Sequence, residues 1–556
     1  MPIVPRLVEL VPRSKDIIQE PLVNAKFTLD SSGVAGFFGG DSAVSGMATV
    51  NLIPNRRWGG WYNTPGSYEI AKQYGQLARS RFWDGLFPGG KHDPAELFGL
   101  DGQIGPRFVA IRSGSSFAST GHLAHLITRM ARDTESTHTA AGRHTNPATV
   151  TIIDLPWDPP QVVECPLSSR LNGSVVFSMI PIAVSWGCCV VCALAGDWYT
   201  FAAILTGIVA NGWACFVIGS GKLTFKHPVP AAEAPPGDGF LLDGRNIVVL
   251  RGTEGAVNSF TQGRFFLQYR EPRDEDWQDE PVRGPHRDRF EARDKEFETL
   301  LDGGEGSPAI RLADNREEER NPGEGKRESA DYLHKVSYAA HEVKDLPSYT
   351  TKHPKKTWAA PTDTSWWQYL RKPLYMLLHP TKKFAGFASF LLTVQFLAQL
   401  LLIPQGQLFG QLMFVATLAA SWAYNSYLSS LDREDIQTTI LRTIFELDKG
   451  DHVKKYELNS WTATAVFTYL SLQTAHPDSA ILHPRKILDV LIPNDTDVWE
   501  AWKRAVEAKV SVGKPLEFTR ASWDLDYLGE KDRRLLRLLL KDAMVAGRVW
   551  ADISAS

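Results

Sequence analysis

Three features are scarce in this chain: cysteine, an excess of charge of either sign, and the short motifs of common enzymes. Only five cysteines occur among 556 residues, too few for the disulfide framework of small secreted domains. The chain has 60 basic and 63 acidic residues, a net charge of −3. We therefore expect neither a disulfide scaffold nor a nucleic-acid-binding protein.

Motifs that would identify a catalytic or nucleotide-binding site are missing. No G-x-S-x-G, H-E-x-x-H or G-x-G-x-x-G pattern is present. The segment GSGKLT at 219–224 resembles a phosphate loop, but the first glycine of that motif would fall on Phe216 and its Ser/Thr on Leu223. We predict no catalytic, cofactor-binding or metal-binding residue, and a constellation assembled only in space stays open.

Charged residues are missing from two long apolar stretches. The first, residues 174–220, is interrupted only by Asp197, and the second, residues 384–428, turns at Pro404-Gln405-Gly406. Each contains two runs near the ~20 residues with which a helix crosses a bilayer. The short links predict two transmembrane helical hairpins, and buried core helices of a soluble protein are the alternative.

The start of the chain lacks the apolar core of a secretory signal peptide. Acidic residues and two early prolines interrupt it. The stretch 33–53 is rich in Gly, Ser and Ala and carries Asp41, so it is too weakly apolar for a span. We expect no cleaved signal.

Basic residues flank both apolar stretches but are missing from their turns. Because Lys and Arg collect on the cytosolic side of membranes, this asymmetry predicts four spans with both termini in the cytosol. Spans near twenty residues with Gln and Asn favour thinner internal membranes, and the organelle stays open. The flanking residues are Arg170, Lys222 and Lys226, then Arg371, Lys372, Lys382, Lys383 and Arg433.

Composition divides the chain into seven regions. The segment 271–360 is highly charged over its first two thirds and predicts a flexible linker. Trp366 and Trp367 near basic residues are typical of a helix in the headgroup layer, with a soluble amphipathic helix as the alternative. We expect a mainly α integral membrane protein with a partly ordered cytosolic N-terminal region (1–173), hairpin 1 (174–220), a small α/β element (221–270), the linker (271–360), an interfacial segment (361–383), hairpin 2 (384–428) and a cytosolic helical domain (429–556).

Local patterns predict elements within these regions. Ser119 and Thr120 offer hydroxyls to cap the helix HLAHLITRMARD. The apolar run 461–472 is too short for a fifth span and predicts a buried helix. We further expect strands at 148–157, 246–251 and 264–269, a short helix at 255–262, and helices at 433–447, 497–510 and 530–550.

Histidines supply the first candidate site. His122 and His125 lie one helical turn apart, and His138 and His144 follow in a Thr-, Ala- and Gly-rich loop. Two such histidines hold zinc when carboxylates or thiolates join them, but no cysteine is near. Ordinary surface histidines are the preferred interpretation.

Cysteines of the first hairpin supply the second candidate. Cys188 and Cys192 are one turn apart and are expected to face Cys215 across the hairpin, with Cys189 beside them. Small residues favour close helix packing in lipid, so we interpret these cysteines as packing residues. Palmitoylation and metal binding are the alternatives.

The apolar stretches contain no His and, apart from Asp197 in a turn, no ionisable Asp, Glu, Lys or Arg. Coupled carriers usually place such groups within their spans. We expect Gln395 and Gln399 to bond Gln411 on the neighbouring helix as glue, with a pore lining as the alternative. The strongest polar groups are Asn211, Gln395, Gln399, Gln411 and Asn425.

Four segments carry a resemblance to a known group. NIVVLRGTEGAVNSFTQGRFFLQY, LLTVQFLAQLLLIPQGQLFGQLMF, SWAYNSYLSSLDREDIQ and LIPNDTDVWEAWK resemble uncharacterised multi-pass membrane proteins of mushroom-forming (basidiomycete) fungi. The resemblance covers the chain from residue 238 onward, without the linker. It implies architecture and host and no activity.

The predicted partners are the lipid bilayer and cytosolic proteins, and the oligomeric state is left open. The leading hypothesis is a membrane-anchored cytosolic interaction or scaffold protein. A channel or transporter subunit is the second hypothesis, and a membrane-bound enzyme is the third. The absence of ionisable groups from the spans favours the first over a coupled carrier.

Overall fold

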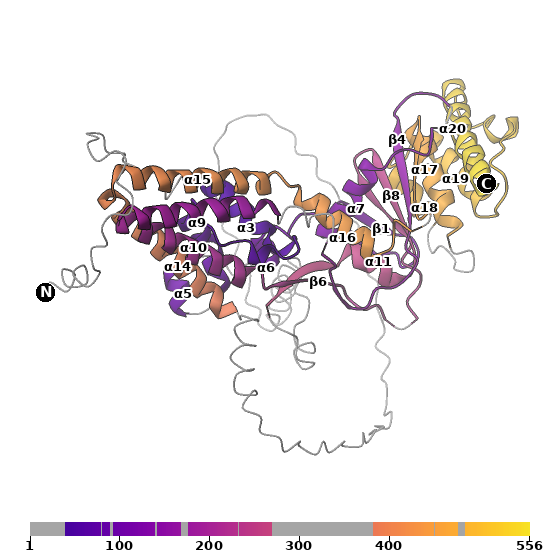
Figure 1. Ribbon diagram of the computed structural model, residues 1–556. Coiled ribbons are helices and arrows are strands. Elements are labelled where there is room, and N and C mark those ends of the chain that lie inside the picture. Colours follow the sequence, from indigo (N-terminus) through magenta and orange to yellow (C-terminus); the bar gives the residue numbers. More distant parts are fainter. Residues whose placement is uncertain are drawn as a thin grey trace, which may run out of the picture. The chain divides into compact units, whose positions relative to one another are not determined.

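The computed structural model describes residues 39–78, 81–88, 93–139, 142–167, 176–231, 233–269, 382–449, 451–475 and 484–555. The predicted linker and nearly all of the interfacial segment lie outside these residues. All described residues belong to one unit, and helices predominate among them, accompanied by two sheets (Figure 1). The mainly helical fold class is thus confirmed.

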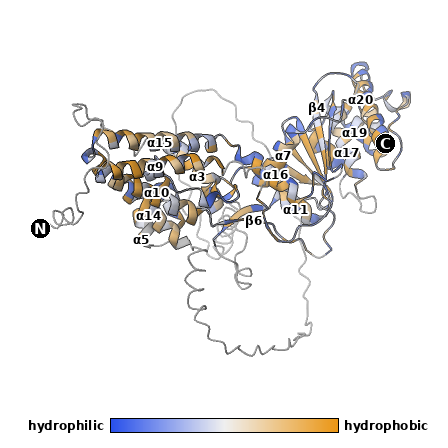
Figure 2. Cartoon of the chain, viewed as in Figure 1, coloured by the Kyte–Doolittle hydropathy of each residue, from blue (hydrophilic) through white to orange (hydrophobic). Residues whose placement is uncertain are grey.

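Both apolar stretches form helical hairpins. The first consists of α9 (Met179–Leu194) and α10 (Trp198–Ile218), and the second of α14 (Lys382–Leu402), the 3₁₀ turn η6 (Ile403–Gln405) and α15 (Leu408–Ser429). Figure 2 shows these four helices as predominantly hydrophobic. Among the described helices, two are long and apolar enough to cross a membrane, by length and composition only. They are α10 and the stretch Phe384–Gln405, which comprises most of α14 and the turn η6.

A single carboxylate joins the turns of the two hairpins. Asp197 Oδ1 accepts a hydrogen bond from Thr200 N at 3.1 Å, and its Oδ2 accepts one from Gln407 N at 3.0 Å. Asp197 therefore caps α10 and also meets the N-terminus of α15, where free N–H groups and the helix dipole favour an anion. Both turns consequently lie at the same end of the four-helix bundle.

The larger sheet has seven strands, drawn from regions far apart in the sequence. Their order is β2-β1-β7-β8-β4-β10-β3. The pairs β4–β8 and β10–β3 are parallel and the other neighbours are antiparallel. The strands are β1 (Arg107–Ala110), β2 (Ser116–Phe117), β3 (His138–Thr139), β4 (Ala148–Asp154), β7 (Gly239–Asp243), β8 (Asn246–Arg251) and β10 (Val453–Leu458).

Helices cover both faces of this sheet. Successive side chains of each central strand point to opposite faces, and in β8 the side chains on both faces are apolar, so both faces need a cover. Val248 and Leu250 of β8 pack in one core with α7 (His122–Asp133), α11 (Glu254–Thr261) and α16 (Arg433–Ile444). Val249 packs in the other core, on the face covered by C-terminal helices. Those helices are α17 (Trp461–Gln473), α18 (Pro484–Leu491), α19 (Asp497–Val510) and α20 (Glu530–Ala555).

A buried ion pair connects the sheet to a C-terminal helix. Arg112 Nε donates to Asp238 Oδ2 at 2.7 Å, and the two side chains are 1% and 0% exposed. Arg112 also donates to the carbonyl of Leu472 in α17, while Asp238 accepts from Gly252 N. Each charged group therefore makes a hydrogen bond in addition to the ion pair. Such additional bonds offset the free-energy cost of removing a buried ion pair from water.

Smaller elements complete the fold. The strands β5, β6 and β9 form a second, antiparallel sheet in the order β5-β6-β9. The remaining elements are β5 (Val162–Glu164), β6 (Lys222–Lys226), β9 (Arg264–Gln268), α3 (Gly40–Ala48), η1 (Thr49–Asn51), η2 (Arg56–Trp58), α4 (Ser67–Tyr74), η3 (Gly75–Ala78), α5 (Arg81–Leu86), α6 (Pro94–Leu97) and η7 (Arg520–Ser522).

Several predicted elements are confirmed. Strands β4 and β8 begin where expected, β4 ends three residues early at Asp154, and α17 is a buried helix. Within the expected small α/β element at 221–270, strands β8 and β9 belong to different sheets. The region after residue 429 is not purely helical, since its strand β10 pairs with β4.

The predicted cap of α7 was wrong. Its N-cap is Gly121, without a side-chain cap, and Thr120 Oγ1 donates instead to the carbonyl of Pro106. This hydroxyl therefore binds the loop before α7 to Pro106, the residue that precedes β1, and does not cap the helix.

Candidate functional site

The candidate site is a segment without regular structure that lies among the four hairpin helices. We call residues 59–66, between η2 and α4, the inner loop. Tyr62, Asn63 and Thr64 at its centre are 1%, 0% and 1% exposed. Backbone that lacks helical hydrogen bonds is costly to bury unless side chains satisfy it. Here the four helices supply those side chains.

Asn63 is the centre of this arrangement. Its backbone N–H donates to Ser185 Oγ of α9 at 3.1 Å, and its side-chain Nδ2 donates to Thr417 Oγ1 of α15 at 2.9 Å. Its carbonyl accepts from Ser421 of α15, and its Oδ1 accepts from Gln399 Nε2 of α14 at 2.8 Å. One residue therefore bonds three of the four helices.

The amides of α14 complete the contacts of the inner loop. Gln395 Nε2 donates to the carbonyl of Thr64 at 3.1 Å, and Gln399 Nε2 also approaches the carbonyl of Ala203 in α10 at 3.4 Å. The expected bond from Gln395 to Gln411 was wrong, because Gln395 Oε1 has no partner and its Nε2 bonds the loop. Gln411 Nε2 donates to carbonyls of its own hairpin turn.

The two asparagines singled out in the sequence also serve the inner loop. Asn211 of α10 donates to the carbonyls of Gly60 and Tyr62, at 2.7 and 3.2 Å. Asn425 of α15 accepts from the Tyr62 hydroxyl at 3.0 Å and donates to Thr64 Oγ1 at 3.2 Å. Four of the five predicted polar residues therefore meet around one segment that the sequence did not identify.

Glycines of α10 let the inner loop approach the helix closely. A Cβ at Gly207 would overlap Asn63 Oδ1 and lie 2.9 Å from Gln399 Nε2. A Cβ at Gly212 would overlap the indole of Trp61 and lie 2.9 Å from its Cζ3. Small residues at such positions are typical of close backbone contacts between apolar helices.

A buried arginine precedes the inner loop. Arg56 is 2% exposed, its Nη1 donates to the Tyr424 hydroxyl at 3.2 Å, and its Nη2 donates to the Gly46 carbonyl at 3.4 Å. Its guanidinium also lies 5.2 Å from the centre of the Tyr424 ring. No described carboxylate forms an ion pair with it, so neutral acceptors and the aromatic face hold this charge.

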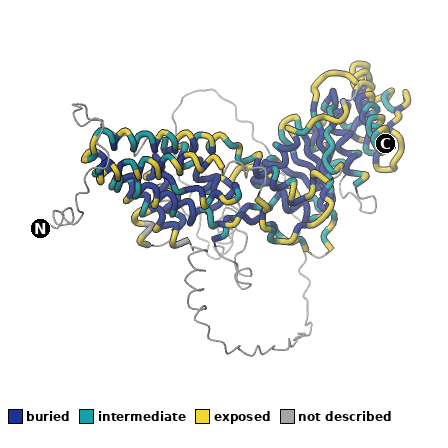
Figure 3. The backbone as a smooth tube through the Cα atoms, in the orientation of Figure 1, coloured by how far each residue is buried: buried dark blue, intermediate teal, exposed yellow. Residues whose placement is uncertain are grey.

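The outer surface of the bundle carries large apolar side chains, whereas its polar side chains lie inside. On α14, Gln395 and Gln399 are 0% and 1% exposed, whereas Leu397 and Leu401 are 49% and 68% exposed. Val190 of α9 is 53% exposed as well. Figure 3 shows exposed and intermediate residues along α15 and α9. The described bundle therefore has polar groups inside and large apolar side chains outside.

The cysteines do not gather as expected. Cys189 and Cys192 lie in a small cluster with residues near the turn, and Cys189 Sγ is 3.9 Å from the Phe201 carbonyl. Cys215 instead lies 3.8 Å from Met47 Sδ, in another cluster. The prediction that Cys188 and Cys192 face Cys215 was wrong, because in a hairpin that turns at 195–197 Cys192 lies opposite residues near 200. Cys215 is about 20 Å further along α10.

The histidines have separate hydrogen-bond partners, and the interpretation of all four as surface residues was wrong for His122, which is 2% exposed. His122 lies 3.3 Å from Gln437 Oε1, and His125 lies 3.3 Å from Glu434 Oε2 on α16. His138 stacks on Tyr456, and His144 is exposed. Within the described residues no group of three or more His, Cys, Asp or Glu side chains could hold a metal ion.

Electrostatics around α7 reflect burial and pairing. Burial lowers the pKa of His122 and the neighbouring His125 lowers it further, whereas the hydrogen bond that its ring donates to Gln437 Oε1 and the nearby Glu434 raise it. Burial alone would raise the pKa of Glu434, but hydrogen bonds from Arg129 and His125 outweigh it and bring it below its usual value. His122 is therefore held neutral, while Glu434 is held as an anion that joins α16 to α7.

Comparison with known proteins gives no relative from which the role of the inner loop could be inferred. No known protein family, no curated protein and no solved structure matches this chain. The class that the fold defines is a mainly helical protein in which two apolar hairpins enclose a polar inner loop, joined to a seven-stranded mixed sheet covered by helices.

Proposed function

We propose that this chain is an integral membrane protein whose two hairpins cross the bilayer four times and anchor the α/β part on the cytosolic side. The observation that carries the proposal is the polarity of the bundle, with amides inside and Leu, Val and Trp side chains outside. In water this arrangement would expose apolar surface and bury polar groups, which costs free energy on both counts. In a bilayer it is the expected one.

The positions of aromatic side chains support the same proposal. Trp198 and Tyr199 at the hairpin turns are 52% and 50% exposed, and Trp422 and Tyr427 of α15 are 41% and 39% exposed. At ~1.5 Å per residue, α15 rises roughly 30 Å from Gln407 to Tyr427, about the hydrocarbon thickness of a bilayer. Exposed Trp and Tyr side chains gather near the two interfaces of a membrane, which lie about this far apart.

The proposed role of the membrane part is to anchor a cytosolic interaction or scaffold protein. The amides of the bundle make hydrogen bonds to the inner loop, so their groups are used for internal cohesion. As part of the same proposal, the chain belongs with the multi-pass proteins of mushroom-forming fungi that it resembles. Isolation of cytosolic proteins that copurify with the full chain tests the scaffold role.

The second candidate, a channel subunit, is favoured by the inner loop itself. Backbone without regular structure inside a membrane bundle is a feature of permeation paths as well as of buried packing. Gln395 Oε1, which has no partner, would then line the path.

The variant Gln395→Leu distinguishes the two candidates. An anchor predicts a loss of about 1 kcal/mol in bundle stability in detergent, with no ion flux through vesicles before or after the change. A channel predicts altered flux with little change in stability. Gln405→Leu, at an exposed position in the turn, is the matched control. A flux change for Gln395→Leu alone would refute the anchor.

Membrane topology has its own test. Single glycosylation sites placed after Ser113 and after Gly513, in two turns of the α/β part, should both stay unmodified in microsomes if both lie in the cytosol. A site placed at Gln405 should face the opposite side, and modification at either of the first two positions would refute the topology.

A further inference from the structure

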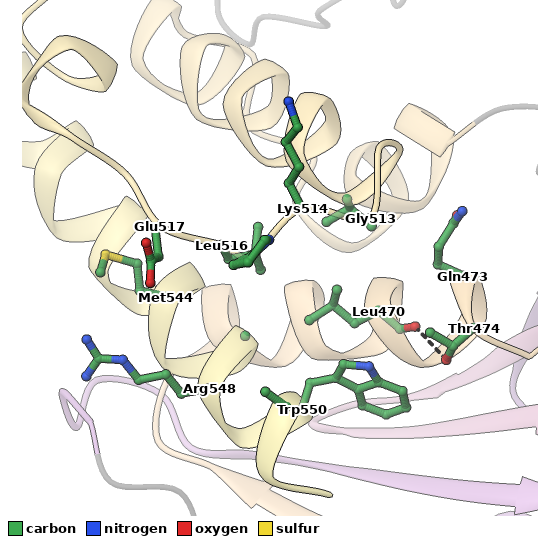
Figure 4. A pocket seen from close by; sticks show the side chains of 14 residues that line it. Leu470, Gln473, Thr474, Gly513, Lys514, Leu516, Glu517, Met544, Arg548 and Trp550 are labelled. Atoms are coloured by element: carbon green, nitrogen blue, oxygen red, sulfur yellow. Dashed lines mark hydrogen bonds between the residues drawn. The ribbon is translucent and has the colours of Figure 1, made fainter. Parts of the chain in front are cut away.

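A cavity of about 400 Å³ lies in the part of the chain that follows the second hairpin. It is bounded by the end of α17, by the loop 513–517 after α19, and by the second half of α20 (Figure 4). This volume falls in the range of about 300–1,000 Å³ that is usual for small-molecule sites.

The floor of the cavity is apolar. Leu470, Leu516, Met544 and Trp550 line it. Trp550 is steadied by an edge-to-face contact with Phe467, whose ring centre lies 5.4 Å away. Methionine adapts its shape to an apolar ligand, and a tryptophan ring offers a large apolar face. These residues suit a flexible hydrocarbon chain.

The loop wall is held close to α20 by a glycine. A Cβ at position 547 would lie 2.9 Å from Leu516 Cβ, which is closer than ordinary contact. The missing side chain lets the 513–517 loop lie against the helix. Both walls are therefore positioned by packing that does not depend on a ligand.

Two cations stand on different walls of the cavity. Lys514 belongs to the loop and Arg548 to α20, and Figure 4 shows their charged ends pointing away from the apolar residues in different directions. Neither takes part in an ion pair with a carboxylate among the described residues. Glu517 is the one acidic residue among the lining residues. The lining therefore carries two cations and one carboxylate around an apolar floor, a net positive charge.

We propose that this cavity binds an amphipathic anion, a fatty carboxylate whose hydrocarbon chain lies on the floor and whose head group meets Lys514 and Arg548. A carboxylate accepts hydrogen bonds from both an ammonium and a guanidinium group, and either long side chain can swing to reach it. A neutral or cationic amphiphile would leave both cations without a partner. This inference concerns residues outside the hairpins and stands or falls separately from the membrane proposal.

Photo-crosslinking with the full chain in phosphatidylcholine nanodiscs tests the site. The probe is dodecanoate carrying a diazirine on its chain, and peptide mapping locates the label. We expect labelling at Leu470, Met544 or Trp550 that unlabelled dodecanoate suppresses and dodecyltrimethylammonium does not. Labelling confined to the hairpin helices, or equal suppression by both competitors, would overturn the proposal.

Variants separate the head-group contacts from general binding. The double variant Lys514→Ala, Arg548→Ala should reduce probe affinity about fivefold, as expected for the loss of two exposed charge contacts. Lys531→Ala, an exposed lysine near the start of α20, is the matched control and should leave affinity unchanged. Leu470→Trp, which fills the cavity, should abolish labelling while circular dichroism verifies that the chain is folded. Unchanged affinity in the double variant refutes the proposed head-group site.

Discussion

The insertion of Asn63 beside α10 makes one substitution especially informative. In Gly207→Ala the new methyl group would overlap Asn63 Oδ1 and lie 2.8 Å from its Cγ. Ordinary contact between such atoms begins near 3.4 Å. The asparagine must therefore move, which disturbs its bonds to Thr417 and Gln399, and Gln399 Nε2 itself would lie 2.9 Å from the new methyl group.

The expected cost follows from the hydrogen bonds that such a shift disturbs. Asn63 accepts from Gln399 at 2.8 Å and donates to Thr417 at 2.9 Å. Each bond contributes about 1 kcal/mol net, and a buried group left without a partner costs about 1–3 kcal/mol. We expect Gly207→Ala to lower the free energy of unfolding by about 2–4 kcal/mol. Alanine would otherwise stabilise a helix interior by ~1 kcal/mol over glycine.

The assay is the unfolding midpoint of the full chain in detergent, with Gly187→Ala as the matched control. Gly187 is also a helix glycine, but nothing lies within 4 Å of its added Cβ, so this control should be neutral or stabilising. In an Asn63→Ala background the overlapping amide is gone, so Gly207→Ala should lower the free energy of unfolding by less than about 1 kcal/mol. The effects of the two substitutions should therefore not add, as is usual for residues in contact. Equal costs in the two backgrounds would show that Asn63 is not beside Gly207.

Three further predictions concern other parts of the fold. Gly410→Ala should destabilise the hairpins by about 1–3 kcal/mol, because its Cβ would overlap the Asp197 carboxylate that joins the two turns; a thermal midpoint equal to that of the unmodified chain would contradict this. Asp238→Ala should cost about 3–5 kcal/mol in chemical unfolding, because it leaves Arg112 buried without its partner; a loss under 1 kcal/mol would contradict it. The pKa of His122 is lowered by burial, so below its ordinary value of about 6.5 the unfolded chain takes up a proton that the folded chain does not. Stability should therefore fall as the pH drops from 7 to 5, and less steeply in His122→Gln, whereas an identical pH slope for the two proteins would refute the assignment.

The sequence alone identified the apolar hairpins and several isolated elements. Long runs without charge, linked by two or three residues, leave a helical hairpin as the simplest structure that satisfies every backbone group. The strands β4 and β8 could also be predicted from local sequence, because both are rich in Val and Ile and are followed by turn residues. Periodicity also showed α16, α19 and α20, because their apolar residues recur at helical spacing.

Tertiary structure decided which of these elements belong together. β10 was missed because Lys454 and Lys455 lower its strand propensity, and it is a strand because β4 supplies a partner edge. The inner loop was missed because its Asn-Thr-Pro-Gly sequence is typical of an exposed turn. Its burial depends on Asn211, Gln395 and Gln399, which come from helices more than a hundred residues away. The sequence revealed those polar side chains within apolar helices, but only the fold revealed that they satisfy the backbone and side chains of a single segment.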